Sequence, residues 1–159
     1  MYKFDWFIVS VDHLPYHYQI RGIGKEKKVF KMFQKFLGVY TLSSQSLSDS
    51  GPIYVQTMSG SETLKYTKSG EENFLYLAYE SKQGQSGLSP YTNGSLVWTI
   101  TPDSPKTRFG SQVSLPICAN ASNLMMPPSR GWYTGSIFGG WKHELNIKVF
   151  PKGGKKDKN

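Results

Sequence analysis

Histidine and cysteine side chains are the first candidates for chemistry in this chain of 159 residues. His13 and His17 stand four positions apart, the spacing that places two metal ligands on one face of a helix. Pro15 lies between them and excludes that helix, and in an extended chain the two rings are ~13 Å apart. Cys118 and His143 are a possible nucleophile–base pair, but the apolar run around Cys118 favours a buried, inert thiol. These residues predict no catalytic centre, no metal and no cofactor.

The glycine-rich motifs and the carboxylate residues likewise predict no catalytic centre. The Gly-Ile-Gly run at 22–24 lacks the third glycine of a dinucleotide-binding fingerprint. The Gly-Gly-Trp-Lys run at 139–142 is not a phosphate-binding loop, which needs Lys followed by Ser or Thr after the glycine. The eleven carboxylates are scattered along the chain. We therefore expect a non-enzymatic protein.

The net charge of +8 is concentrated in two short blocks. Residues 21–38 hold six bases and one acid, and residues 142–159 hold six bases and two acids. Clustered positive charge attracts polyanions, acidic partners or anionic surfaces, although lysines also serve simply to keep a domain soluble. We expect partner binding through six lysines of these blocks: Lys27, Lys28, Lys31, Lys35, Lys155 and Lys156.

The type of basic residue narrows the class of partner. Sixteen of the nineteen bases are lysine, which lacks the planar fork with which arginine reads nucleic-acid bases. An acidic protein or a polyanionic matrix is therefore the favoured partner. Non-specific nucleic-acid binding is a weaker alternative, because it needs aromatic side chains interleaved with basic side chains on one face. The longest apolar run, six residues at 74–79, is too short for a membrane span of ~20.

Aromatic residues, 14% of the chain, provide a second candidate site. Trp132, Tyr133 and Trp141 lie in a glycine-rich stretch, where flat rings are able to stack on a sugar or on another chain. This pattern is compatible with a lectin-like carbohydrate-binding module. It is equally compatible with a lid that closes one end of a β domain.

The candidate residues lie on or between segments whose sequence pattern predicts β-strands. Apolar and polar residues alternate in short segments, with Gly, Ser, Asn or Pro between them about every ten residues, which is typical of an all-β sandwich or barrel. The expected strands are residues 4–11, 16–21, 39–42, 52–56, 62–68, 73–79, 96–100, 112–117, 132–134 and 144–150. Residues 73–79 are the most apolar and should be central. Residues 25–37 differ, because apolar residues at spacings of 3, 4 and 7 predict one amphipathic helix that ends at Gly38.

We predict a single domain over residues 1–151, with a basic Gly/Lys tail at 152–159. Its fold should be an antiparallel β-sandwich or flattened barrel of about eight to ten strands with one short helix. The expected core residues are Trp6, Ile20, Tyr40, Val55, Leu75, Leu77, Trp98, Ile100 and Ile147. A single cysteine and no signal-like segment favour the cytoplasm, with an extracellular matrix or scaffold as the alternative.

The succession of motifs also resembles a small β module repeated in many uncharacterised eukaryotic proteins. Its pieces are Gly-Val-Tyr at 38–40, Gly-Pro-Ile-Tyr at 51–54, Phe-Leu-Tyr-Leu-Ala-Tyr at 74–79, Trp-Thr-Ile at 98–100 and Pro-Ser-Arg-Gly-Trp at 128–132. The resemblance covers about residues 18–149 and implies a small β domain without an established enzymatic role. We therefore expect a structural or interaction module that docks into a larger protein assembly.

Overall fold

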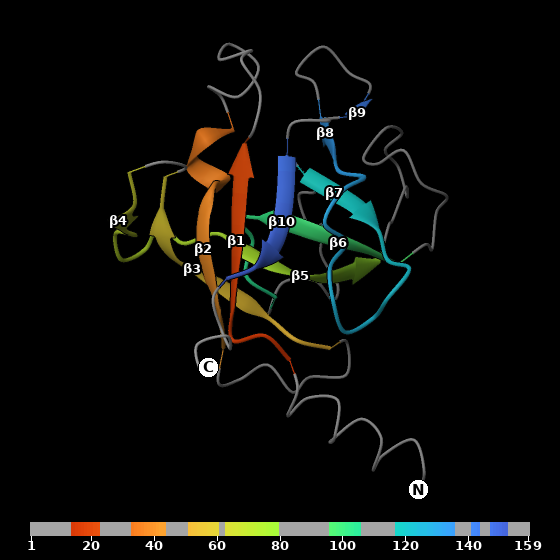
Figure 1. Ribbon diagram of the computed structural model, residues 1–159, viewed down its shortest axis with the longest axis horizontal. Coiled ribbons are helices and arrows are strands. Elements are labelled where there is room, and N and C mark those ends of the chain that lie inside the picture. Colours follow the sequence, from red (N-terminus) through yellow and green to blue (C-terminus); the bar gives the residue numbers. More distant parts are fainter. Residues whose placement is uncertain are drawn as a thin grey trace, which may run out of the picture.

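The chain folds into one curled antiparallel sheet (Figure 1). The computed structural model describes residues 14–22, 33–43, 51–60, 63–79, 96–105, 117–135, 141–143 and 147–152. The strands are β1 (His17–Gly22), β2 (Gly38–Leu42), β3 (Tyr54–Ser59), β4 (Lys65–Tyr66), β5 (Phe74–Tyr79), β6 (Leu96–Thr101), β7 (Ile117–Asn120), β8 (Tyr133–Gly135), β9 (Trp141–His143) and β10 (Ile147–Pro151). Their order is β10-β1-β2-β3-β5-β6-β7-β8-β9, with β4 paired to β3.

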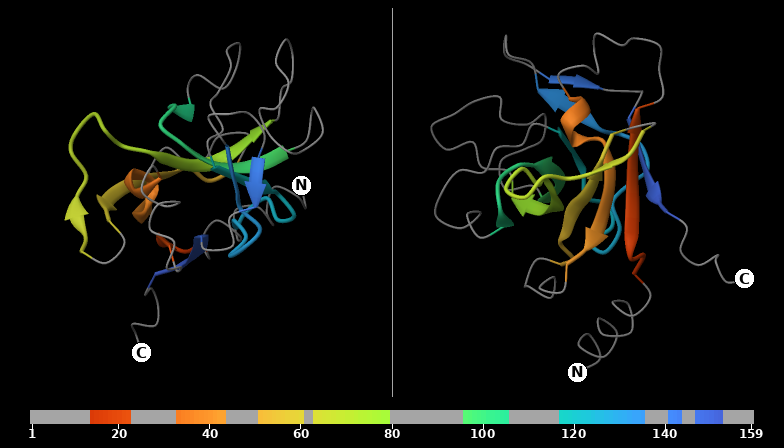
Figure 2. Two further views of the ribbon diagram at one scale, coloured as in Figure 1. Left: turned by 90° about the horizontal axis from the view of Figure 1, so that it is seen from above. Right: turned by 90° about the vertical axis from the view of Figure 1, so that its left-hand side faces the viewer.

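The predicted all-β, antiparallel class is confirmed, and its finer shape is not. The described strands form a half-barrel, whose curl can be followed in Figure 2, from above and from the side. Neither a two-sheet sandwich nor a closed barrel is shown by this part of the chain. β5 lies in the middle of the order, as the apolar run at 73–79 predicted.

Several strand predictions need correction. The segment predicted at 52–56 begins later, because β3 starts at Tyr54 and continues to Ser59. Of the described residues 63–68, only Lys65 and Tyr66 form a strand, which pairs with β3, and both side chains are exposed. β9 was not expected. The strand predicted at 4–11 lies outside the described residues, as does most of the one predicted at 112–117.

The predicted amphipathic helix is not confirmed. Within the described residues, the segment 25–37 contributes only a single 3₁₀ turn, η1 (Gln34–Phe36). Phe33, Phe36 and Leu37 are buried, so the apolar positions of the predicted helix do face the core. Gly38 does not cap a helix; it is the first residue of β2.

The concave side of the curled sheet holds the main core. Alternating residues of each strand point into it, as the period of two requires. Its larger members are Tyr18, Ile20, Tyr40, Tyr54, Leu75, Leu77, Trp98, Ile100, Ile117, Trp132, Ile147 and Val149. Burial raises the pKa of the Tyr18, Tyr40 and Tyr54 hydroxyls, so these rings are neutral core side chains.

The expected core list is confirmed except at two positions. Val55 is only half-buried, because Tyr54 and Gln56 occupy the inward positions of β3 and place Val55 on the other face. Trp6 lies outside the described residues. A second buried cluster on the outer face of β5–β7 contains Tyr76, Ala78, Val97 and Cys118. The central strands are therefore apolar on both faces.

Polar side chains anchor η1 to the sheet. Gln56 donates to the carbonyls of Lys35 and Leu37, at 3.0 Å each, and Asn73 donates to the Lys35 carbonyl at 3.1 Å. Tyr40 donates to the Phe36 carbonyl at 2.7 Å. Buried amides are costly unless they are hydrogen-bonded, and here the Gln56 and Asn73 side chains are paired with carbonyls of this turn.

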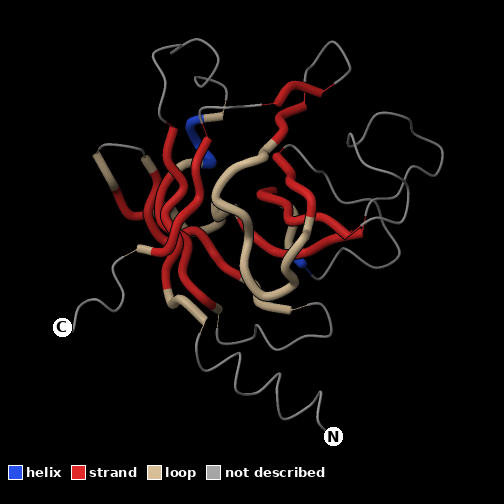
Figure 3. Tube along the Cα trace, turned by 45° about the vertical axis from the view of Figure 1, so that its right-hand side comes forward, coloured by secondary structure: helices blue, strands red, loops and turns tan. Residues whose placement is uncertain are grey.

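The connection between β7 and β8, residues 121–132, crosses from β7 to the edge of β10. We call it the closing connection; it is the long tan loop of Figure 3. The indole of Trp98 donates to the Asn123 carbonyl at 2.8 Å, and that of Trp132 donates to the Pro128 carbonyl at 3.0 Å. The Val149 amide of β10 donates to the Ser129 carbonyl at 3.1 Å. These hydrogen bonds hold the connection across the open side of the half-barrel.

Candidate functional site

The pairing of β1 with β10 joins the two basic blocks of the sequence. Arg21 opens the first block, Lys148 belongs to the second, and the antiparallel register places them directly opposite each other. Both side chains point away from the core, since their neighbours Ile20 and Val149 are buried. Charges more than 120 positions apart in the chain therefore share one surface.

Two further rows complete this surface. Gln19 lies opposite Phe150, and both are half-buried. At the other end, the Lys152 amide donates to the His17 carbonyl at 2.9 Å, so those two residues form the third row. We call this surface the cationic face and define it by Arg21, Lys148, Gln19, Phe150, His17 and Lys152.

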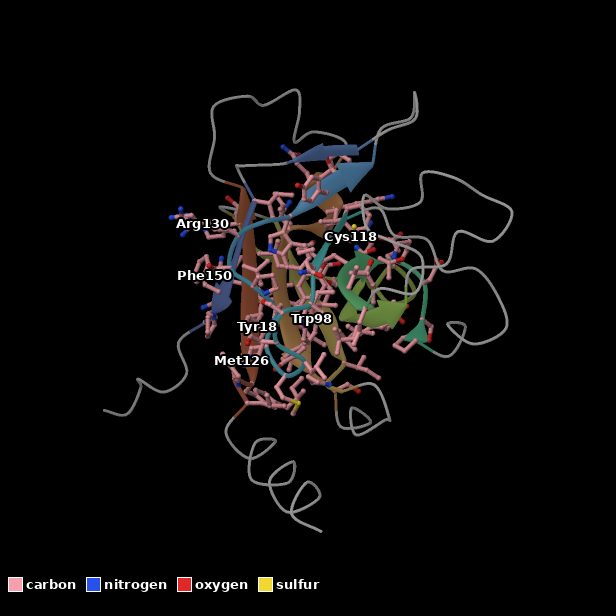
Figure 4. All side chains as sticks on the ribbon, turned by 90° about the vertical axis from the view of Figure 1, so that its right-hand side faces the viewer. Tyr18, Trp98, Cys118, Met126, Arg130 and Phe150 are labelled. Atoms are coloured by element: carbon pink, nitrogen blue, oxygen red, sulfur yellow. The ribbon has the colours of Figure 1, made fainter. Side chains whose placement is uncertain are left out.

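Arg130 extends the positive charge beyond the edge of β10. Its neighbour Ser129 accepts the hydrogen bond from Val149, so the closing connection lies against this strand. Arg130 is exposed, and in Figure 4 its side chain and that of Phe150 lie on the outer side of β10, away from Trp98. The described carboxylates, Glu71, Glu72 and Asp103, belong to the β4–β5 connection and the segment after β6. None of them neutralises the cationic face.

His17 is held in a polar chain that crosses three strands. Its Nδ1 lies 3.0 Å from the Thr41 hydroxyl of β2, which lies 2.8 Å from the Thr57 hydroxyl of β3. Partial burial, and secondarily the positive charge of Lys152, lower the pKa of His17 below its usual value of 6.5. The imidazole is therefore mainly neutral at pH 7.

The lysines predicted to bind a partner are mostly beyond what the structure describes. Lys27, Lys28, Lys31, Lys155 and Lys156 all lie outside the described residues. Lys35 is exposed on η1, with its Nζ 5.3 Å from the centre of the Phe36 ring, and it is not part of the cationic face. The sequence hypothesis missed Arg21, Lys148 and Lys152 as site residues, although each lies within one of its two basic blocks. The missing information was the strand register.

The aromatic stacking site must be corrected at Trp132. This ring is completely buried in the main core, so it offers no face to a sugar. Tyr133 is half-buried in β8, and Trp141 lies in β9 with a side chain outside the described part of the structure. Trp132 instead packs in the main core at the end of the closing connection. Residues 136–140 of the glycine-rich stretch lie outside the described residues, so the lid interpretation stays a prediction.

The residues first considered for catalysis do not come together. Cys118 is buried, as predicted, and the backbones of Cys118 and His143 are separated by β8, with Tyr133 between them in register. Two strand spacings put them roughly 10 Å apart. His17 lies in a strand, and His13 is outside the described residues. Among the residues that the structure describes, no three His, Cys, Asp or Glu side chains are grouped to hold a metal ion.

Comparisons with known proteins provide no assignment. No family model matches the chain, and no curated protein or solved structure is detectably similar to it. Of the helical segments in the described ranges, none has the length and apolarity needed to cross a bilayer.

Proposed function

We propose that this protein is a non-enzymatic interaction module that docks onto an acidic or polyanionic partner, in a larger assembly, through its cationic face. The observation that carries the proposal is the Arg21–Lys148 pair. Like charges directly opposite each other on neighbouring strands destabilise a sheet. The pair therefore contributes no attraction within the fold, and both positive charges are available to an anionic partner.

The strength of the attraction between the cationic face and an anionic partner depends on several cations acting together. A single exposed ion pair contributes about 0–1 kcal/mol, so no one lysine would hold a partner. Arg21, Lys148, Lys152 and Arg130 lie on or beside two adjacent strands, and their fields add at this surface. The attraction should weaken as the Debye length falls from ~10 Å at 0.1 M salt to ~3 Å at 1 M.

The substitution Lys148→Glu tests the proposal because binding and stability should move in opposite directions. It replaces the like-charged pair by an attractive one, so the free energy of unfolding should rise by about 0.2–1 kcal/mol. Affinity for labelled heparin and labelled polyglutamate, measured by fluorescence anisotropy, should fall by roughly tenfold as two charges of the face are lost.

Lys65→Glu is the matched control. It makes the same change in net charge at an exposed position of β4, outside the cationic face. It should leave both affinities nearly unchanged. If the two variants weaken binding equally, the attraction is a property of net charge and the proposed site is wrong.

A further inference from the structure

The three rows of the cationic face alternate in chemistry. Arg21 and Lys148 form one end row, and His17 and Lys152 form the other. Four residues of extended strand separate these rows, which is roughly 13 Å. Phe150 lies in the row between them, half-buried and beside Gln19. An aromatic ring therefore stands between the Arg21–Lys148 pair and the cation of Lys152 on one continuous surface.

This alternation discriminates among anionic partners. An acidic peptide supplies carboxylates, and a sulfated polysaccharide supplies sulfates on puckered sugar rings, so neither provides a planar π-face in each repeat. In duplex nucleic acid the base faces are already stacked. A single strand offers both phosphates and an accessible π-face on every base, the combination that cations with interleaved aromatic rings bind.

We propose that the cationic face binds single-stranded nucleic acid, with the phosphates along Arg21, Lys148 and Lys152 and a base stacked on Phe150. This inference rests on the proposed function and specifies the partner for the same surface. From the sequence alone, nucleic acid ranks as a weaker alternative, because basic and aromatic residues occupy separate segments of the chain. The inference reverses that ranking. Sequence preference should be weak, because stacking accepts any base and lysine is a point charge.

The test compares an oligothymidylate with inorganic polyphosphate of matched charge, each binding to the full chain in an anisotropy or competition assay. Phe150→Leu keeps an apolar side chain but removes the π-face. It should weaken oligothymidylate binding by about tenfold, within the range of one base stack, and leave polyphosphate binding unchanged. Phe150→Trp should bind the oligothymidylate at least as well as the natural protein, which also shows that the position tolerates change.

The charge variants separate this inference from the proposed function. The double variant Arg21→Gln/Lys148→Gln should weaken both ligands and lower the salt dependence of oligothymidylate binding by about 1.4 in log–log slope, or 0.7 for each lost phosphate contact. If Phe150→Leu affects both ligands equally or neither, stacking is refuted and the proposed function stands. Tighter binding of polyglutamate than of oligothymidylate would also refute nucleic acid as the partner. If the natural protein binds none of these polyanions, both proposals fail.

Discussion

The surroundings of His17 within the cationic face lower the pKa of its imidazole. Lys152 is the charged group beside it from the β10 end, and Thr41 of β2 contributes only a hydroxyl. On its own segment, the Tyr16 ring meets the imidazole edge to face, with ring centroids 4.6 Å apart. Partial burial and this neighbouring lysine disfavour the imidazolium, so arginine and lysine carry the positive charge of the face at neutral pH.

A pH dependence of folding follows from the lowered pKa of His17. The unfolded chain binds a proton near pH 6.5, whereas the folded chain does so only at lower pH. The contribution to stability is therefore complete above pH 6.5 and is lost as the pH falls through that value toward the folded pKa. The free energy of unfolding should drop on acidification, and His17→Gln should remove that part of the drop.

An NMR titration of the His17 imidazole gives the pKa directly. Lys152→Gln should raise this pKa part of the way toward 6.5, because burial, the larger cause, remains. A His17 that titrates at or above 6.5 in the natural protein would contradict the description of its surroundings.

Among the elements, the contact between β2 and β3 depends on one glycine. Gly38 has a φ of 139°, and a Cβ at this position would collide with the Met58 carbonyl and lie 2.8 Å from the Ser59 Cα. The register between these strands shifts just beyond it, between Val39 and Tyr40. The close approach at Gly38 therefore lies beside the irregularity that bends β2 against β3.

Gly38→Ala should destabilise the fold strongly. Both the backbone conformation and the collision oppose a side chain, so we expect a loss of more than about 3 kcal/mol in urea denaturation. Gly70→Ala is the control, since Gly70 also has a positive φ, 88°, but nothing lies within 4 Å of the added Cβ. Its loss should be about 1–2 kcal/mol. Equal losses would show that the β2–β3 contact yields easily.

The elements that were predicted correctly are those with a local signal. β1 alternates apolar and polar residues, and β2, β5 and β6 are short, mostly apolar runs between turn residues, so the local pattern was sufficient. β9 has three residues and is defined by pairing with β8, which no local pattern contains. The order of the curled sheet depends on pairing between segments far apart in the chain, such as β1 with β10. For that reason the class of the fold was predictable and its half-barrel shape was not.

Over the whole molecule, the two basic blocks could be found from the sequence, and the face that they build could not. Composition located the surplus charge in residues 21–38 and 142–159. The β1–β10 register, which is set by packing of Ile20 and Val149, decides that Arg21 meets Lys148 and that Phe150 lies between the cationic rows. Lys35 belongs to the same basic block as Arg21, but η1 carries it elsewhere. Binding predictions at this scale require the register as well as the charges.

Mapping of a bound polyanion by NMR tests the central claim most directly. Backbone amide shifts would be followed while oligothymidylate or heparin is added to the full chain at low salt. The largest saturating changes should fall in His17–Gly22 and Ile147–Pro151, with small changes at Lys65–Tyr66, and they should disappear at high salt. Changes centred on β4 or on residues 121–127, or the lack of any saturating change with either polyanion, would contradict the account.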